Sequence, residues 1–204
     1  MTTKKKQNLK MVDFYEKYKY DKNIIGKSKS WFQSEMVKIE RKRLTPPKLI
    51  ANNGYGLHKS KMAIGKMYCF LYDAKMKKEL PYYDKFPLIF IFNATDTHFW
   101  GINLHYMHPF HRAQLMDGLL KFASDDKLTS QTKMKFTWQT IAGFSRTRFA
   151  KPAVKQYLYT QVKSPFTEIP AFDWFSALMI NPARFNVPQE QVWRDSLRIS
   201  RDWK

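Results

Sequence analysis

The chain has 204 residues, the size of one domain or of one domain with a terminal arm. Its 36 Lys and Arg against 17 Asp and Glu give a net charge of +19, and 44% of the residues are hydrophobic. The apolar content is enough for a sizeable core and excludes a wholly disordered chain. The excess of positive charge favours a polyanionic partner, with nucleic acid ahead of an anionic membrane surface. No run of about 18 apolar residues occurs, so we expect no transmembrane helix.

The first third of the chain is its most basic part. Residues 1–62 hold 16 Lys and Arg against 5 Asp and Glu, a net charge of +11. The first ten residues offer little to bury, so we expect them to be mobile. In residues 14–22 aromatic side chains alternate with lysines, which suits base stacking with phosphate contact and equally an arm that docks on a neighbouring subunit. We therefore predict a basic, partly extended N-terminal arm over residues 1–60 and a globular domain over residues 61–204.

One short helix is predicted within this arm, at residues 30–44. Its first turn carries a capping box, Ser30 with Gln33. Apolar residues at helical spacing mark one face: Phe32, Met36 and Ile39. Three cations crowd its C-terminal end, where they favour the helix dipole and would serve equally to clamp a phosphate: Arg41, Lys42 and Arg43. Pro46 ends the helix, and a loop is predicted at residues 51–56.

Residues 65–120 hold the strongest β pattern. Three runs of β-formers with turns between them predict an antiparallel meander: residues 67–73, 86–93 and 98–106. Gly101 in the third run indicates a bulge or a close approach of two backbones. At Pro109 the apolar period changes to three or four residues, so an amphipathic helix packed on the sheet is predicted at residues 109–123.

The stretch from Lys127 to Thr167 has eight Lys and Arg and no acidic residue. Helical apolar spacing predicts two helices here, at residues 132–144 and 152–162, and a helix-turn-helix arrangement stays open. A fourth strand is predicted at residues 166–169. Residues 172–180 are ambiguous between helix and strand, and the C-terminus is a short helix or an ordered tail. The fold class is therefore α+β, a small antiparallel sheet with packed helices that follows the basic arm.

No group of residues with catalytic spacing stands out. Histidines are the best metal candidates, but they span a strand end, a proline and a helix start: His98, His105, His108 and His111. Carboxylates are isolated, and neither a Gly-rich phosphate loop nor a nucleophile elbow is present. Cys69 lies in an apolar run and is expected to be buried and inert. We expect no enzyme, no cofactor and no metal. A nuclease is the third hypothesis, behind a DNA-binding role and a structural role.

The candidate DNA-binding residues are clustered cations of the arm and of the acid-free stretch. They are Lys27, Lys29, Arg41, Lys42, Arg43, Lys133, Lys135, Arg146, Arg148, Lys151 and Lys155. Charge runs are usually solvated faces, so clustering alone leaves open which of these cations touches phosphate.

Several sequence segments resemble those of one phage protein family. LPYYDKFPLIF and GINLHYMHPFHRAQLMD, followed by KPAVKQYL and QVWRDS, are similar to the DNA end protector family of T-even-type contractile-tailed phages. The resemblance covers residues 65–196, and the basic arm matches only loosely. It implies a minor virion protein without catalytic residues that binds the terminus of packaged double-stranded DNA, protects it from host exonucleases and assists head completion.

The resemblance also implies where the protein acts and with what. The virion, and the host cytoplasm after injection and during assembly, are the expected locations. Phage portal, neck or tail proteins are the expected protein partners, no membrane partner is expected, and a homo-oligomer stays open. The alternative is a structural neck, tail or baseplate subunit of such a phage, whose contact with DNA is incidental.

Overall fold

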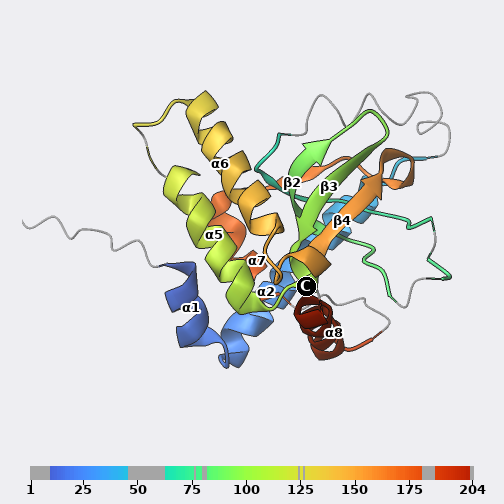
Figure 1. Ribbon diagram of the computed structural model, residues 1–204. Coiled ribbons are helices and arrows are strands. Elements are labelled where there is room, and N and C mark those ends of the chain that lie inside the picture. Colours follow the sequence, from blue (N-terminus) through green and yellow to red (C-terminus); the bar gives the residue numbers. More distant parts are fainter. Residues whose placement is uncertain are drawn as a thin grey trace, which may run out of the picture.

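The computed structural model describes residues 10–45, 63–75, 77–79, 82–123, 125, 127–180 and 187–202. Within them a five-stranded antiparallel sheet is packed with helices, which confirms the predicted α+β class (Figure 1). The α-helices are α1 (Met11–Tyr18), α2 (Lys22–Arg41), α5 (Pro109–Ala123), α6 (Ser130–Ser145), α7 (Trp174–Leu178) and α8 (Gln189–Asp202). The strands are β1 (Met67–Cys69), β2 (Leu88–Ala94), β3 (His98–Asn103), β4 (Val154–Leu158) and β5 (Thr167–Ile169). Short 3-10 helices are η1 (Leu104–Tyr106), η2 (Lys151–Ala153), η3 (Tyr159–Gln161) and η4 (Ala171–Asp173).

The sheet has the order β4-β3-β2-β1-β5, and every neighbouring pair is antiparallel. The predicted meander is confirmed as β1-β2-β3, and the predicted fourth strand is confirmed as β5, on the edge beside β1. The helix predicted at residues 152–162 is wrong, because β4 forms there and pairs with β3 over five residues. The helix-turn-helix hypothesis falls with it. The close backbone approach predicted at Gly101 is confirmed, since a Cβ there would lie 3.1 Å from the Phe90 carbonyl oxygen, and 2.8 Å from Ile89 Cδ1. The register shift of this pair lies on the partner strand, between Ile91 and Asn93 of β2.

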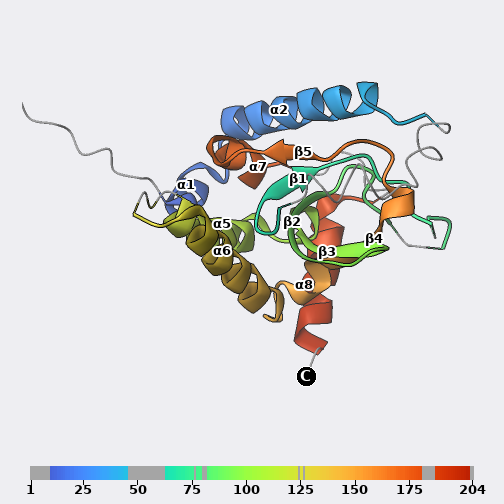
Figure 2. The same ribbon diagram turned by 90° about the horizontal axis from the view of Figure 1, so that it is seen from above.

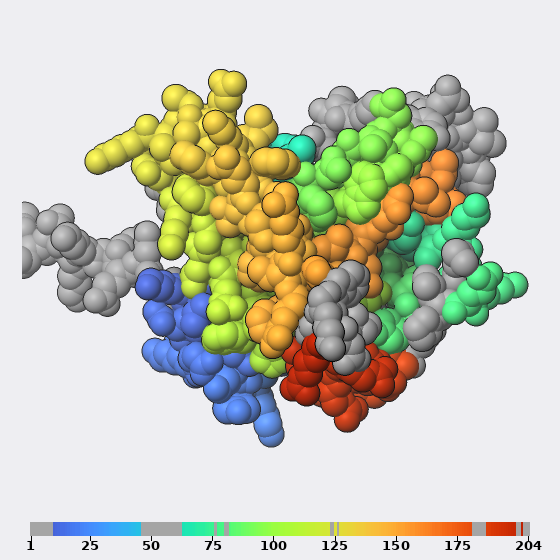
Figure 3. Space-filling model, in the orientation of Figure 1, coloured from blue at the N-terminus to red at the C-terminus, as the bar shows by residue number. Residues whose placement is uncertain are grey.

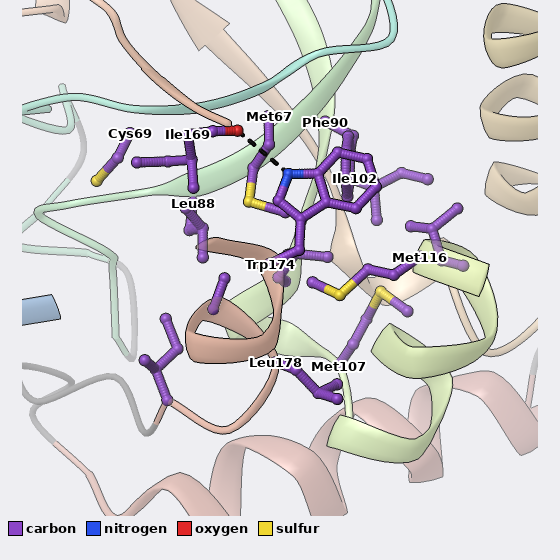
Figure 4. Packing of buried hydrophobic residues seen from close by; sticks show 14 of the residues in the cluster. Met67, Cys69, Leu88, Phe90, Ile102, Met107, Met116, Ile169, Trp174 and Leu178 are labelled. Carbon is purple, nitrogen blue, oxygen red and sulfur yellow. Dashed lines mark hydrogen bonds between the residues drawn. The ribbon is translucent and has the colours of Figure 1, made fainter. Parts of the chain in front are cut away.

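The two faces of the sheet belong to two separate hydrophobic clusters. Strand alternation sends Met67 and Phe90 to the face that the helices cover, and their sequence neighbours Tyr68 and Ile89 to the other face. Trp174 of α7 lies against the helix-covered face, next to Met67, Phe90, Ile102 and Met116 (Figure 4). Its indole Nε1 donates to the Ile169 carbonyl at 3.1 Å, which ties α7 to β5. The ambiguous segment 172–180 is therefore helical at its centre.

Helices α5 and α6 pack against each other beside the sheet (Figure 1). The bounds predicted for α5 are confirmed, and α6 is one or two residues longer at each end than predicted. Thr129 caps α6, because its side chain accepts from the Thr132 backbone N–H at 3.2 Å. Arg112 of α5 is fully buried and donates to the carbonyls of Met107, Leu178 and Ile180, so it links α5 to α7 and its C-terminal end. Burial lowers the pKa of this guanidinium to about 9.

The N-terminal residues that the structure describes form two helices against the body of the molecule. The predicted apolar face of α2 is confirmed, since Phe32, Met36 and Ile39 are buried in the main core. The predicted start of this helix is wrong: Asp21, not Ser30, caps it and accepts from two backbone N–H groups. Figure 2 shows α2 lying along one side of the molecule, over α7 and β5. Residues 1–9, the loop predicted at 51–56 and the arm boundary near residue 60 lie outside the described residues.

Candidate nucleic-acid interface

The predicted cations fall into two groups on different sides of the molecule. One group lies on α2 and directly after it, and the other runs from α6 to β4. Figure 2 shows α2 and α6 lying well apart in the molecule, so the fold does not gather all eleven cations on one face. We call these sets the α2 group and the α6–β4 group.

The α2 group consists of exposed cations: Lys27, Lys29, Arg41, Lys42 and Arg43. Within the described residues none of them takes part in an ion pair. The two nearby glutamates pair elsewhere, Glu35 with Lys38 at 2.6 Å and Glu40 with Lys85 at 3.2 Å. The positive charge of the group is therefore uncompensated by local carboxylates and is available to phosphate.

The α6–β4 group has its densest part where the chain turns from α6 into β4. Arg146 caps the C-terminus of α6, Arg148 follows in the turn, and Lys151 begins η2. Arg146 and Arg148 are exposed. Between them and β4, Phe149 is 39% exposed as a residue, and its ring stacks on His111 of α5 with ring centroids 4.4 Å apart. The turn thus places cations beside a partly exposed aromatic residue, the combination that suits a nucleic-acid chain.

Helix α8 adds cations that sequence reasoning missed. Its exposed arginines follow one another at helical spacing on the side away from the core: Arg194, Arg198 and Arg201. The helix packs against η2, and its surface lies beside the end of α6 and the following turn in Figure 3. These arginines do not stand out as a basic stretch of the sequence, because Glu190, Asp195 and Asp202 lower the net charge of the segment. Their spacing of three or four residues, which places them on one face of a helix, is the sequence signal that indicates them.

Three members of the α6–β4 group are placed differently from the turn. Lys133 and Lys135 lie near the start of α6, Lys133 half-buried and Lys135 exposed. Lys155 is on β4 and faces a cavity, and burial lowers the pKa of its ammonium group to about 8. It is therefore not a surface cation of the kind that the sequence suggested.

The histidines do not form a metal site in the part of the chain that the structure describes, where no three His, Cys, Asp or Glu residues gather. His105 is buried and its Nδ1 lies 2.6 Å from Asp84 Oδ2. Asn103 Nδ2 donates to the same carboxylate oxygen at 2.9 Å and to the Tyr157 hydroxyl at 3.0 Å. Burial lowers the pKa of His108. Cys69 is buried, as predicted, and its burial raises the pKa of the thiol.

Fold and surface together define the class: a basic α+β protein whose exposed cations suit a polyanion. The chain belongs to the family described as the phage T4 terminal DNA protecting protein, which matches residues 2–196. This confirms the resemblance carried by residues 65–196 and extends it through the basic N-terminal residues. No curated protein and no solved structure matches the chain. Among the described helices, none has the length and apolar character to cross a bilayer.

Proposed function

We propose that this protein binds the ends of packaged linear phage DNA and shields them from host exonucleases. The observation that carries the proposal is the family match, which spans residues 2–196 and whose description names the protection of terminal DNA. The net charge of +19 and the exposed cations of both groups support the affinity that such a role requires.

The turn between α6 and β4 is the part of the surface best suited to the duplex. It presents Arg146 and Arg148 beside the exposed ring of Phe149, and α8 contributes further arginines next to it. Phosphate contacts of this kind position a protein on DNA without reading sequence, which fits a protein that must accept whatever sequence lies at the end.

An exonuclease protection assay tests the proposal. The full chain is incubated with linear duplex DNA at low salt, a processive double-strand exonuclease is added, and the remaining DNA is measured over time. We expect protection that saturates at a small number of protein molecules per end and that weakens steeply as salt rises. Nicked circular DNA is the competitor that separates end binding from general coating. Digestion at an unchanged rate at low salt contradicts the proposed function.

Assistance in head completion, residence in the virion and contact with portal, neck or tail proteins belong to the same proposal. A protein bound at the last-packaged DNA end would lie at the head opening, next to the proteins that close it. The test is a comparison of virions assembled with and without the protein, in which filled heads that fail to join tails are expected without it.

We further propose that protection works by occupancy and involves no cleavage. The test is incubation of the protein with linear DNA and Mg²⁺ or Mn²⁺, with no exonuclease added. The DNA is expected to stay intact, and metal-dependent loss of DNA would favour a nuclease instead.

A further inference from the structure

A cavity of about 320 Å³ opens beside the start of β4. Its walls come from β4, from η1 and from both ends of the connection between β1 and β2. Four tyrosines line it: Tyr72, Tyr83, Tyr106 and Tyr157. Lys75 and Lys155 line it as well. The cavity therefore combines aromatic surface and positive charge, at the small end of the range of about 300–1,000 Å³ that small-molecule sites occupy.

Lys155 is a cation without a counterion in this cavity. Its Nζ lies 4.1 Å from the centroid of the Tyr106 ring. Within the described residues no hydrogen bond and no ion pair reaches the ammonium group. A half-buried charge that lacks a counterion costs free energy, and an anion in the cavity would offset that cost.

Asp84 also lines the cavity, but its carboxylate is already engaged. Oδ1 accepts from the Phe86 backbone N–H at 3.1 Å. Oδ2 accepts from Asn103 and lies 2.6 Å from His105 Nδ1. These contacts fix Asp84 in the cavity wall and leave Lys155 for a ligand.

The second cation of the cavity, Lys75, indicates how much negative charge the ligand should carry. Lys75 is exposed and forms no ion pair in the described part of the chain, whereas nearby Lys77 pairs with Asp73 at 2.6 Å. Two uncompensated cations suit a dianion. A phosphate monoester carries a charge of about −1.5 to −2 at pH 7, while each internal phosphodiester of DNA carries only one negative charge. In DNA the monoester occurs only at a chain end.

We propose that this cavity binds the 5′-phosphorylated terminal nucleotide of one DNA strand, with the phosphate on Lys155 and Lys75 and the base against the tyrosine rings. The volume admits one nucleotide and excludes a base pair, so the terminal base leaves its partner to enter. Opening one pair costs a few kcal/mol, and stacking on an aromatic side chain returns about 1–3 kcal/mol per base. The inference rests on the proposed function, because it assigns that function a specific contact with the DNA end.

The first experiment compares 5′-phosphorylated with 5′-hydroxyl duplexes of identical sequence, by fluorescence anisotropy with the full chain. We expect the phosphorylated end to bind about tenfold more tightly, the effect of a hydrogen-bonded charge. Lys155→Met should abolish that preference and Lys75→Met should reduce it, whereas Lys121→Met removes one exposed charge elsewhere and should keep it. Thermal melting verifies that each variant is folded, and the exposed Lys75 gives a second variant whose substitution leaves the core untouched.

Further measurements distinguish a phosphate at a DNA end from a free phosphate, and the cavity proposal from the proposed function. Free deoxyadenosine monophosphate or inorganic phosphate that competes as well as the DNA end would overturn the inference in favour of a small-molecule site. A duplex with a mismatched terminal pair should bind more tightly than a paired one, and equal affinity contradicts entry of the base. If the protein protects linear DNA but shows no preference for the 5′-phosphate, this inference is contradicted and the proposed function still holds. If the protein gives no protection, the proposed function itself is contradicted.

Discussion

At the scale of single residues, Lys155 shows how the fold changes the meaning of a charge. In the sequence it is one more cation of an acid-free stretch, and in the structure it is half-buried in the wall of a cavity, with its ammonium group over the Tyr106 ring. Burial lowers its pKa from 10.5 to about 8, so the charged form is less favourable in the folded protein than in the unfolded chain.

Replacing Lys155 by Met should stabilise the protein at neutral pH. Below pH 8 the lysine is protonated in both states and its full desolvation cost is present. Between about pH 8 and 10.5 the unfolded chain binds more protons, so wild-type stability rises with pH and the advantage of the variant shrinks. We expect an advantage of about 2 kcal/mol at pH 7 in urea unfolding. For the Lys121→Met control, the difference in unfolding free energy from the wild type should not change between pH 8 and 10.5. If the stabilisation by Lys155→Met is the same at every pH, burial of the Lys155 charge is not its cause.

Gly101 provides a test of close packing in the sheet. An added Cβ would lie 2.8 Å from Ile89 Cδ1 and 3.1 Å from the Phe90 carbonyl oxygen. Gly101→Ala should therefore cost about 1–3 kcal/mol in the free energy of unfolding. Combining it with Ile89→Val removes Cδ1 and should recover part of the loss. Gly143→Ala, which meets no atom within 4 Å on exposed helix α6, is the matched control and should be neutral or slightly stabilising.

At the scale of elements, α1 is attached to the body by a carboxylate from α5. Asp117 accepts from the backbone N–H groups of Met11 at 2.6 Å and Val12 at 3.1 Å, so a residue more than a hundred positions away caps this helix. Asp117→Ala should destabilise the docking of α1 by about 1–2 kcal/mol, as the loss of a cap does. Limited proteolysis should then cut within residues 10–22. Glu16→Ala breaks only an exposed pair with Lys19 and should leave the cleavage pattern unchanged.

Substitutions in the α6–β4 group and in the α2 group can be compared for their effects on DNA binding. Replacing Arg146, Arg148 and Lys151 together by Gln should reduce the slope of log affinity against log salt by up to about 3, if each contacts one phosphate. The same number of changes in the α2 group, Lys27, Lys29 and Arg41 to Gln, removes equal charge on the other side of the molecule. Equal losses in the two variants would show that general charge, rather than the turn between α6 and β4, supports binding.

At the scale of the whole molecule, the net charge of +19 acts on stability as well as on binding. Like charges repel across a compact surface, and salt screens them over a Debye length of about 10 Å at 0.1 M. We therefore expect the melting temperature to rise as NaCl increases from low to moderate concentration. Short duplex DNA should raise it further at low salt, because a ligand of the native state stabilises it. A melting temperature that falls over the same range of salt would contradict this expectation.

Elements with a strong local period were predictable from the sequence. Helix α5 follows from Pro109 and the apolar residues after it, and β2 and β3 follow from dense runs of β-formers that a short turn joins. The candidate surface was predictable in part, since Arg146 and Arg148 are exposed where an acid-free stretch suggested cations, while the arginines of α8 were hidden among acidic neighbours.

The sequence by itself determined the α+β class, the central meander, the basic character and the phage family. The tertiary structure alone decided that Val154 and Leu158, spaced as on a helix, belong to a strand, because β3 offers them a partner edge. It also decided that Asp117 caps a distant helix and that Lys155 lies in a cavity. The physical reason is range: periodicity reports the local chain, whereas pairing, capping and burial depend on residues that only the folded molecule brings together.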